Sequence, residues 1–138
     1  VPNTQTATKL ITEHPELFVD YEITKGKMDD IFLAVKTIIE AINDNFYDST
    51  IDLKALLNQS GYSEDYIRAQ FKKVTGKTPT EFLTKVRIDH ACHLIDLFKN
   101  TLPLSDVAEK CGYSDYVYFS RRFKQVMGVS PKEYMAND

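Results

Sequence analysis

The sequence lacks several features that define whole classes of protein. No apolar run reaches eighteen residues, so we expect no membrane-spanning helix. The chain also lacks a glycine-rich phosphate loop, a nucleophile elbow and a set of metal ligands, which excludes the common catalytic constellations. We therefore expect neither an enzyme nor a cofactor.

Cysteine is scarce as well. The two cysteines, Cys92 and Cys111, fit neither a C-x-x-C metal motif nor a disulfide framework, and their use suits a reducing cytosol. His90 and His93 flank Cys92, but a third ligand with suitable spacing is missing. A buried cysteine beside surface histidines is the preferred interpretation of this segment.

The N-terminal part is unlike the rest of the chain. The sequence begins at Val1 without methionine, and its first residues do not resemble a signal peptide. We therefore expect this sequence to be part of a longer protein that has a sensing domain upstream. Residues 1–28 are too apolar for a pure linker, and His14-Pro15 indicates a break. This extension is interpreted as a linker, the remnant of a sensing domain, a dimer contact or a short helix packed on the domain.

The net charge of −3 is unevenly distributed. Residues 1–50 contain four Lys/Arg against nine Asp/Glu, whereas residues 51–138 contain thirteen against eleven. Within the second part, residues 66–87 carry six cationic side chains and one acidic one, and residues 116–132 carry four cationic ones and no acid. Because local clusters set the field that phosphates meet, the acidic total does not exclude nucleic acid.

An internal repeat dominates the C-terminal two thirds of the chain. Eleven residues recur 51 or 52 positions later, and the change of offset places one extra residue between Ser114 and Tyr118. The repeated residues of the first copy are Leu53, Gly61, Tyr62, Ser63, Tyr66, Phe71, Lys72, Val74, Gly76, Pro79 and Glu81. Matches that include glycines and aromatics indicate two structural units of the same kind.

Each copy predicts the same succession of elements. A short apolar helix is followed by Gly61 or Gly112, then by Ser63 or Ser114 as the candidate N-cap of a second helix, which Gly76 or Gly128 ends. Two helices joined by a short turn with glycine form a helix-turn-helix. The residues expected in the core of the second helices are Tyr66, Ile67, Phe71 and Val74, and Tyr118, Phe119, Phe123 and Val126, with Tyr62, Tyr113 and Cys111 packing beside them.

Two capping boxes with proline at the first helical position follow the repeats, at residues 78–81 and 130–133. The first opens a long helix over 79–99, and an amphipathic helix is predicted at about 29–46. The predicted fold is all-α, with about seven helices and two helix-turn-helix subdomains joined by a long central helix. Its parts are a first unit over 29–78, the linker helix over 79–99 and a second unit over 100–138.

The length of the linker helix suits two helix-turn-helix units that contact DNA one helical turn apart. About twenty residues at 1.5 Å each span about 30 Å, close to the repeat of about 34 Å between successive turns of the major groove. The spacing predicts that one chain, as a monomer, covers a site of roughly 20 base pairs.

Residues 29–137 resemble the DNA-binding domain of the AraC/XylS family of bacterial regulators. The resemblance is carried by residues 106–115 (Asp-Val-Ala-Glu-Lys-Cys-Gly-Tyr-Ser-Asp), 118–124 (Tyr-Phe-Ser-Arg-Arg-Phe-Lys) and 128–131 (Gly-Val-Ser-Pro), with Tyr134. It implies a cytoplasmic transcription regulator that binds double-stranded DNA and works with RNA polymerase. An activator is expected, and repression stays open.

The resemblance also implies which residues read DNA, because the second helix of each unit enters the major groove in that family. The groove-facing residues would be Asp65, Arg68, Ala69, Tyr116, Val117, Ser120 and Arg121. Arg68 and Arg121 are the leading base readers, since arginine suits a bidentate contact with guanine. The family often has arginine where this chain has Ala69. Asp65 accepts from a cytosine amino group, caps the helix or pairs with Arg68.

Further cationic residues are expected at phosphates, which supply affinity more than sequence choice. They are Lys72, Lys73, Lys77, Arg122, Lys124 and Lys132, and for each one a solvated surface position is an equal alternative. Arg87 lies in an apolar stretch of the linker helix, where a partly buried salt bridge to Asp89 or to an acid on another helix is preferred to a DNA contact.

A helical module that binds protein stays as the alternative function, because the overall charge is negative. Salt separates the two functions. DNA binding weakens steeply with added salt through counterion release, whereas docking through apolar helix faces barely responds.

Overall fold

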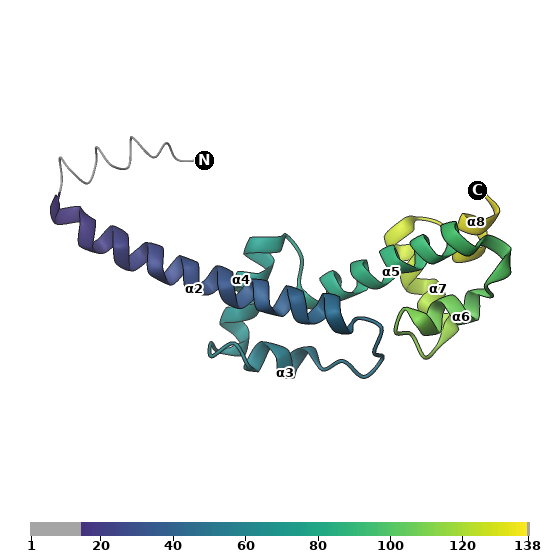
Figure 1. Ribbon diagram of the computed structural model, residues 1–138, viewed down its shortest axis with the longest axis horizontal. Helices are drawn as coiled ribbons and strands as arrows, with labels where there is room; N and C mark the ends of the chain where they lie inside the picture. The colour runs from purple at the N-terminus through teal and green to yellow at the C-terminus, as the bar shows by residue number, and fades with distance from the viewer. Residues whose placement is uncertain (1–14, 138) are drawn as a thin grey trace.

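The computed structural model describes the backbone of residues 15–137, and side chains from residue 29 onward. Within this range the chain is all helical, without a strand, as the sequence predicts (Figure 1). Seven α-helices and one 3-10 helix follow one another: α2 Pro15–Asn45, α3 Leu53–Asn58, α4 Glu64–Thr75, α5 Pro79–Phe98, η1 Lys99–Thr101, α6 Leu104–Lys110, α7 Tyr116–Met127 and α8 Pro131–Ala136. Between Pro15 and Asn137, no helix combines the length and the hydropathy that a membrane span requires.

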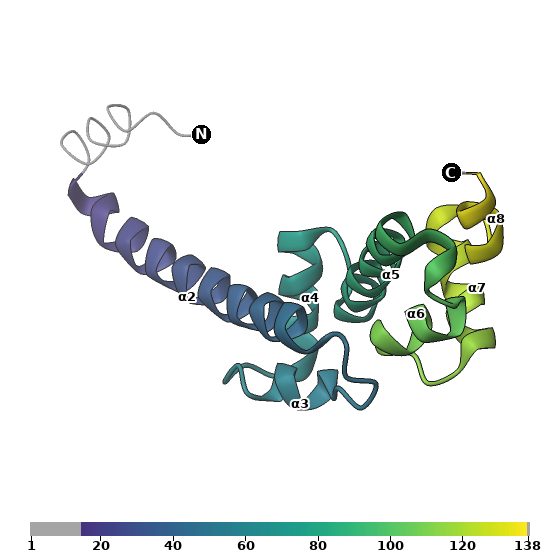
Figure 2. The same cartoon turned by 45° about the vertical axis from the view of Figure 1, so that its right-hand side comes forward.

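Helix α2 begins earlier than the amphipathic pattern predicts. It runs without interruption from Pro15, so half of the supposed extension belongs to the first helix and the predicted start at residue 29 is wrong. Proline at the first helical position is compatible with this start, because its missing N–H would have no partner there. Figures 1 and 2 show the N-terminal part of α2 extending away from the other helices. Residues 1–14, and the predictions made for them, lie outside the described residues.

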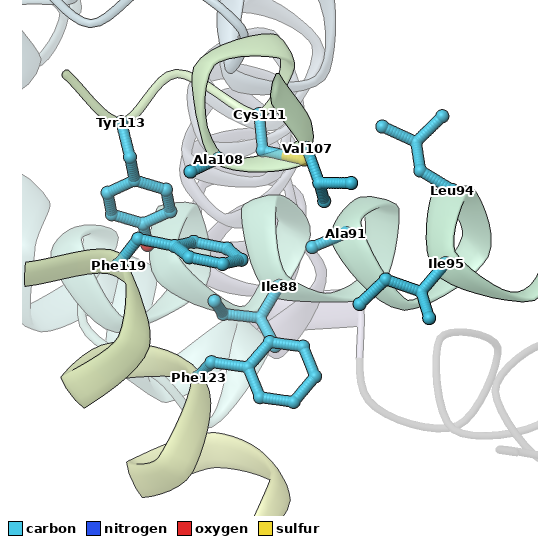
Figure 3. Packing of buried hydrophobic residues seen from close by; sticks show 10 residues of the cluster. All are labelled: Ile88, Ala91, Leu94, Ile95, Val107, Ala108, Cys111, Tyr113, Phe119 and Phe123. Carbon is cyan, nitrogen blue, oxygen red and sulfur yellow. The ribbon is translucent and has the colours of Figure 1, made fainter. Parts of the chain in front are cut away.

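Two separate hydrophobic cores divide the molecule. The first joins α2 to the α3–α4 pair, and its fully buried members include Ile42, Leu57, Ile67 and Phe71. The second joins α5 to the α6–α7 pair and is drawn in Figure 3. Helix α5 serves both cores, because Leu83 near its start packs in the first, and residues 88–95 pack in the second. The long central helix thus connects two units that each have their own core.

Cys111 illustrates how the second core is packed. Its side chain is fully buried among Val107, Ala108 and Phe119, and burial raises the pKa of its thiol to about 12. A thiol with so high a pKa stays protonated and behaves as a small apolar side chain. The prediction that Cys111 packs in the core is confirmed.

The helix ends follow the predicted chemistry with one exception. The Oγ atoms of Thr78 and Ser130 accept from the third residues of α5 and α8, and both capping boxes are complete. Ser63 caps α4, but Asp115 caps α7, so the prediction of Ser114 is wrong. The residue inserted after Ser114 moves the helix start by one position, and the Asp115 carboxylate accepts from the amides of two residues in the first turn.

Arg87 does not form the predicted salt bridge with Asp89. The carboxylate of Asp89 binds Lys85, one helical turn earlier on the exposed side of α5. Arg87 instead points inward, where its guanidinium donates hydrogen bonds to the backbone carbonyls of Phe46 and Asp48. Residues 87 and 89 lie about 200° apart around the helix, so the two side chains leave opposite faces.

Candidate nucleic-acid interface

Helix α4 buries one face and exposes the other. Ile67 and Phe71, one turn apart, are fully buried. The exposed residues on the opposite side recur at spacings of three and four: Asp65, Ala69, Lys72 and Lys73. This face therefore combines an anionic, a small and two cationic side chains. Asp65 and Ala69 are exposed on it, and their contact with bases stays a prediction.

Arg68 lies beside this face and is engaged within the protein. Its Nε is 3.7 Å from Glu64 Oε2, and the other carboxylate oxygen of Glu64 is buried without a hydrogen-bond partner. The ion pair of Arg68 is thus formed with Glu64, and not with Asp65 as one alternative proposed. Asp65 does not cap α4 either, because the cap is Ser63. The Arg68 guanidinium is thus directed, through its Nε, toward a carboxylate on its own helix.

Helix α7 exposes a different set of side chains. Tyr116 and Val117 in its first turn are 36% and 58% exposed, and Arg121 is exposed one turn later. Ser120 is half-buried at the edge of the same surface. Phe119 and Phe123 fill the opposite, fully buried face. Val117 and Arg121 therefore face solvent, whereas the Tyr116 ring packs beside that of Phe119, with centroids 5.9 Å apart, and borders the buried face. Contact of these residues with bases stays a prediction.

Tyr66 and Tyr118 are not core residues, contrary to the sequence prediction. They are 41% and 48% exposed. Successive residues of a helix are rotated by 100°, so a helix that buries Phe119 and Phe123 leaves Tyr118 on its flank. The same geometry leaves Tyr66 outside the Ile67–Phe71 face.

Val74 is also misplaced by the prediction. It is 38% exposed and does not join the first core, whereas Val126 at the matching position is packed against the second. The last turn of α4 is therefore less covered than that of α7.

Tyr118 forms a surface cluster with two neighbours. The guanidinium carbon of Arg122 lies 4.9 Å from the centre of the Tyr118 ring, and Arg122 Nη1 donates to Gln125 Oε1 at 2.7 Å. A cation held over an aromatic face keeps its charge while its position is restricted. Tyr118 and Gln125 were missed by the sequence analysis. A helical wheel centred on Phe119 and Phe123 would have identified both as exposed.

The cationic residues assigned to phosphates lie at several helix ends. Lys72 and Lys73 occupy the last turn of α4 and Lys124 that of α7, where a positive charge is favourable to the helix dipole. Lys132 is exposed at the start of α8, and Lys77 is half-buried in the turn before α5. The sequence prediction of solvent-accessible cations agrees with these positions, and their contact with phosphate stays a prediction.

A cleft of about 440 Å³ brings cations from both units together. It is lined by Lys77 from the turn before α5, by Lys85 from α5, and by Arg122 and Gln125 from α7. Glu81 lies in the same cleft, and its hydrogen bonds with Thr78 lower the pKa of its carboxyl, which keeps it ionised. The structure thus places Lys77 near Arg122, although 45 residues separate them.

Comparison with known proteins agrees with this arrangement. A family model described as a helix-turn-helix domain matches residues 56–137, more than half of the chain. The HTH-type transcriptional activator RhaR of Salmonella dublin is 34% identical over 90 residues, which cover 65% of this chain and 31% of that protein. The chain therefore spans less than a third of the length of this curated relative.

Solved structures give the same result for the fold. The C-terminal domain of AraT, a response regulator from Geobacillus stearothermophilus, superposes with a TM-score of 0.69 at 31% identity, covering 76% of this chain and 85% of that domain. A probable AraC family transcriptional regulator from Rhodopseudomonas palustris superposes with a TM-score of 0.64 at 27% identity, covering 75% and 95%. With two capped helix-turn-helix units on one central helix, this chain belongs to the AraC/XylS family of transcription regulators and contains its sequence-specific DNA-binding domain.

Proposed function

We propose that α4 and α7 enter two successive segments of the major groove on one face of a DNA duplex. The observation that carries this proposal is the pair of matched twelve-residue helices, each capped at its start, ended by a left-handed glycine and attached to α5. The twenty residues of α5 span about 30 Å, and the groove repeats about every 34 Å. A single chain then covers two half-sites.

In the second half-site, Arg121 is the leading base reader. It is exposed in the middle of α7, and a guanidinium makes a bidentate contact with guanine better than any other side chain. Tyr116 and Val117 offer apolar contact to a thymine methyl, and Ser120 at the edge reaches a base or a phosphate. Sequence choice is therefore concentrated in the first two turns of α7.

In the first half-site, Asp65 and Ala69 face the groove and Arg68 approaches it from the side. Ala69 supports only apolar contact, and Asp65 supports a contact with a cytosine amino group. Arg68 is held by Glu64, so its base contact costs the ion pair. The first unit is proposed to contribute fewer base contacts and relatively more phosphate contacts than the second.

Affinity is proposed to come from cations around these helices. The phosphate contacts are assigned to Lys72, Lys73, Lys77, Arg122, Lys124 and Lys132, with Arg122 and Lys77 meeting the backbone between the two half-sites. Contacts of this kind position a protein on the duplex without selecting a sequence.

The chain is proposed to act as the output part of a larger regulator. A sensing domain upstream would control it, RNA polymerase would be its partner at the promoter, and the cytoplasm, where the chromosome lies, would be its location. Activation is the proposed outcome, since RhaR is described as a transcriptional activator.

The experiment is a fluorescence-anisotropy titration of the chain with a labelled duplex that contains a selected site, repeated at several salt concentrations. Arg121→Ala is expected to cost about 1–3 kcal/mol and to relax sequence choice, whereas Lys124→Ala weakens all sequences alike and lowers the salt slope by about one. Lys36→Ala removes the same charge from an exposed position of α2 to which no DNA contact is assigned, and is the matched control.

Salt dependence also separates this function from docking on a protein. Binding that falls steeply between low and physiological salt supports the DNA proposal. Equal loss of sequence preference from Arg121→Ala and Lys124→Ala would overturn the assignment of roles. Absence of any salt-sensitive duplex binding would favour a protein partner.

A further inference from the structure

Arg87 binds the first unit from the middle of α5. Its Nε donates to the carbonyl oxygen of Phe46 at 2.8 Å, and its Nη2 donates to the carbonyl oxygen of Asp48 at 2.9 Å. Both acceptors belong to the connection between α2 and α3. Hydrogen bonds from a charged donor are stronger than neutral ones, and two from one planar group fix the orientation of their acceptors.

The loop that Arg87 binds is itself held in shape. The Asp48 carboxylate accepts from the backbone N–H of Thr50 at 2.9 Å and from its hydroxyl at 2.6 Å. The ring of Phe46 packs against His90 of α5, with centroids 4.9 Å apart. The carbonyls are therefore presented by an ordered turn, and a change at Arg87 alters the attachment of this turn to α5.

The same guanidinium also contacts the second unit. Its central carbon lies 5.2 Å from the centre of the Tyr113 ring, and Tyr113 is only 5% exposed in the turn between α6 and α7. Tyr113 packs in turn on Phe119, with ring centroids 5.4 Å apart. Phe119 anchors the buried face of α7. Arg87 is thus linked through one aromatic ring to the second recognition helix.

Gly112 makes the approach between the units possible. Its φ is +94°, and a Cβ at this position would lie 2.3 Å from the carbonyl oxygen of Phe46 and 2.9 Å from Arg87 Nε. At Gly61, the matching glycine of the first unit, the same construction meets nothing within 4 Å. The close approach of Gly112 to Phe46 and Arg87 is therefore specific to the place where the two units meet, which we call the junction. The turn of a helix-turn-helix does not by itself require such a contact.

Beside this contact the junction is open. A cleft of about 680 Å³ separates Tyr47, Asp48 and Ser49 of the first unit from residues of α6 and the following turn. Across the width of this cleft the described residues of the two units make no packed contact that would resist rotation of one unit against the other. The relative angle then depends on the stiffness of α5 and on the group of contacts around Arg87.

We propose that Arg87 is a positioning residue that fixes the angle between the two helix-turn-helix units and so selects the spacing between half-sites. This inference rests on the proposed binding of two half-sites. One base pair of extra spacing moves a half-site by about 3.4 Å and rotates it by about 34°, so a rigid junction discriminates between spacings and a loose one does not.

The first test needs no DNA. Backbone ¹⁵N relaxation measures the rotational correlation time of each unit in the wild-type chain, in Arg87→Lys and in Lys36→Ala. We expect the two units to share one correlation time in the wild type and in the Lys36 control. In Arg87→Lys the values should separate, because an ammonium group lacks the planar array of donors that binds both carbonyls while contacting the Tyr113 ring. Shared tumbling in Arg87→Lys contradicts the proposal.

A second pair of variants guards against unfolding. Tyr113→Phe keeps an aromatic ring beneath the guanidinium and should preserve shared tumbling. Tyr113→Leu removes the ring and should separate the two units in the same way as Arg87→Lys. Identical tumbling in these two variants would overturn the role of the ring contact.

The second test scans the spacing. Affinity is measured for duplexes in which the gap between half-sites is changed by one and two base pairs. For the wild type a change of one base pair should lower affinity about tenfold, and for Arg87→Lys less than about threefold, with affinity for a single half-site unchanged. A uniform loss at every spacing would contradict the proposal. Failure of the wild type to bind any duplex would reject the DNA function, while the relaxation result would stand by itself.

Discussion

The two helix-turn-helix units are copies in sequence but differ in what supports them. The first recognition helix packs on α2, which lies before it in the chain, whereas the second packs on α5. The first carries an internal ion pair between Glu64 and Arg68, and the second exposes a row of aromatic and cationic side chains. One scaffold thus presents two chemically unlike surfaces.

This difference predicts an asymmetric binding site. Two units with identical groove-facing residues would select repeated half-sites. Here the units should select different bases, because α4 presents Asp65 and Ala69 whereas α7 presents Arg121 and Tyr116. The second face is richer in side chains that discriminate bases, so the second half-site should contribute most of the specificity.

The largest expected effect concerns the two turn glycines. Both have positive φ, but only Gly112 lies against another unit. Gly112→Ala should cost about 3 kcal/mol or more, because backbone strain adds to overpacking, and Gly61→Ala about 1 kcal/mol. Urea unfolding of both variants measures the two free energies. Equal losses would show that the junction relaxes freely.

The next largest effect is the loss of DNA affinity when Arg121 of α7 or Arg68 of α4 is replaced. Arg121→Ala should weaken specific DNA binding by about 1–3 kcal/mol, and Arg68→Ala by less, since Arg68 loses the Glu64 pair when it reaches a base. Titrations against the selected duplex and against single-base variants of each half-site measure both. A larger loss for Arg68→Ala would reverse the ranking of the two units.

Removing the N-caps of α4 and α7 should change the unfolding free energy by smaller amounts. The Asp115 carboxylate accepts from two amides, at 2.8 and 3.3 Å, and the Ser63 hydroxyl from one, at 3.3 Å. Asp115→Ala should therefore cost about 1–2 kcal/mol and Ser63→Ala about 0.5–1 kcal/mol of unfolding free energy. Thermal melts of the two variants show which one loses more stability. A greater loss of stability for Ser63→Ala than for Asp115→Ala would contradict this prediction.

The smallest effect is a pH dependence at the junction. Burial, with the nearby His93, lowers the pKa of His90 below its usual 6.5. As the pH falls, the unfolded chain binds the proton first, so the contribution of His90 to stability is complete above about pH 6.5 and is lost below it. Urea midpoints between pH 7.5 and 5 should fall less in His90→Gln than in the wild type. The same slope in both would exclude His90 as the cause.

Much of the fold follows from local sequence signals. The glycines, both capping boxes and the apolar spacing determine α3 to α8 almost to the residue, because turn and cap chemistry is local. The start of α2 was misjudged because the helix begins at Pro15, whereas the amphipathic pattern becomes clear only further along. Ser114 was misassigned because the inserted residue shifts the start of α7.

The site was predictable in outline and less so in its partners. Exposed positions of α4 and α7 follow from helical periodicity, and the flanking tyrosines and Val74 were misplaced. The Glu64–Arg68 pair joins residues one helical turn apart, so its spacing could have indicated it. The contacts of Arg87 depend on which acceptors the fold brings near, and spacing along the chain does not give this for residues 39 to 41 positions apart. Tertiary contacts of long side chains are where pattern reasoning failed.

Selection of bound duplexes from a random DNA pool tests the central claim most directly. The chain should enrich a two-part site whose unlike halves are centred about ten base pairs apart, and Arg121→Ala should lose preference in one half only. Enrichment of a single half-site, or of no sequence at all, would contradict the claim that both units read DNA together.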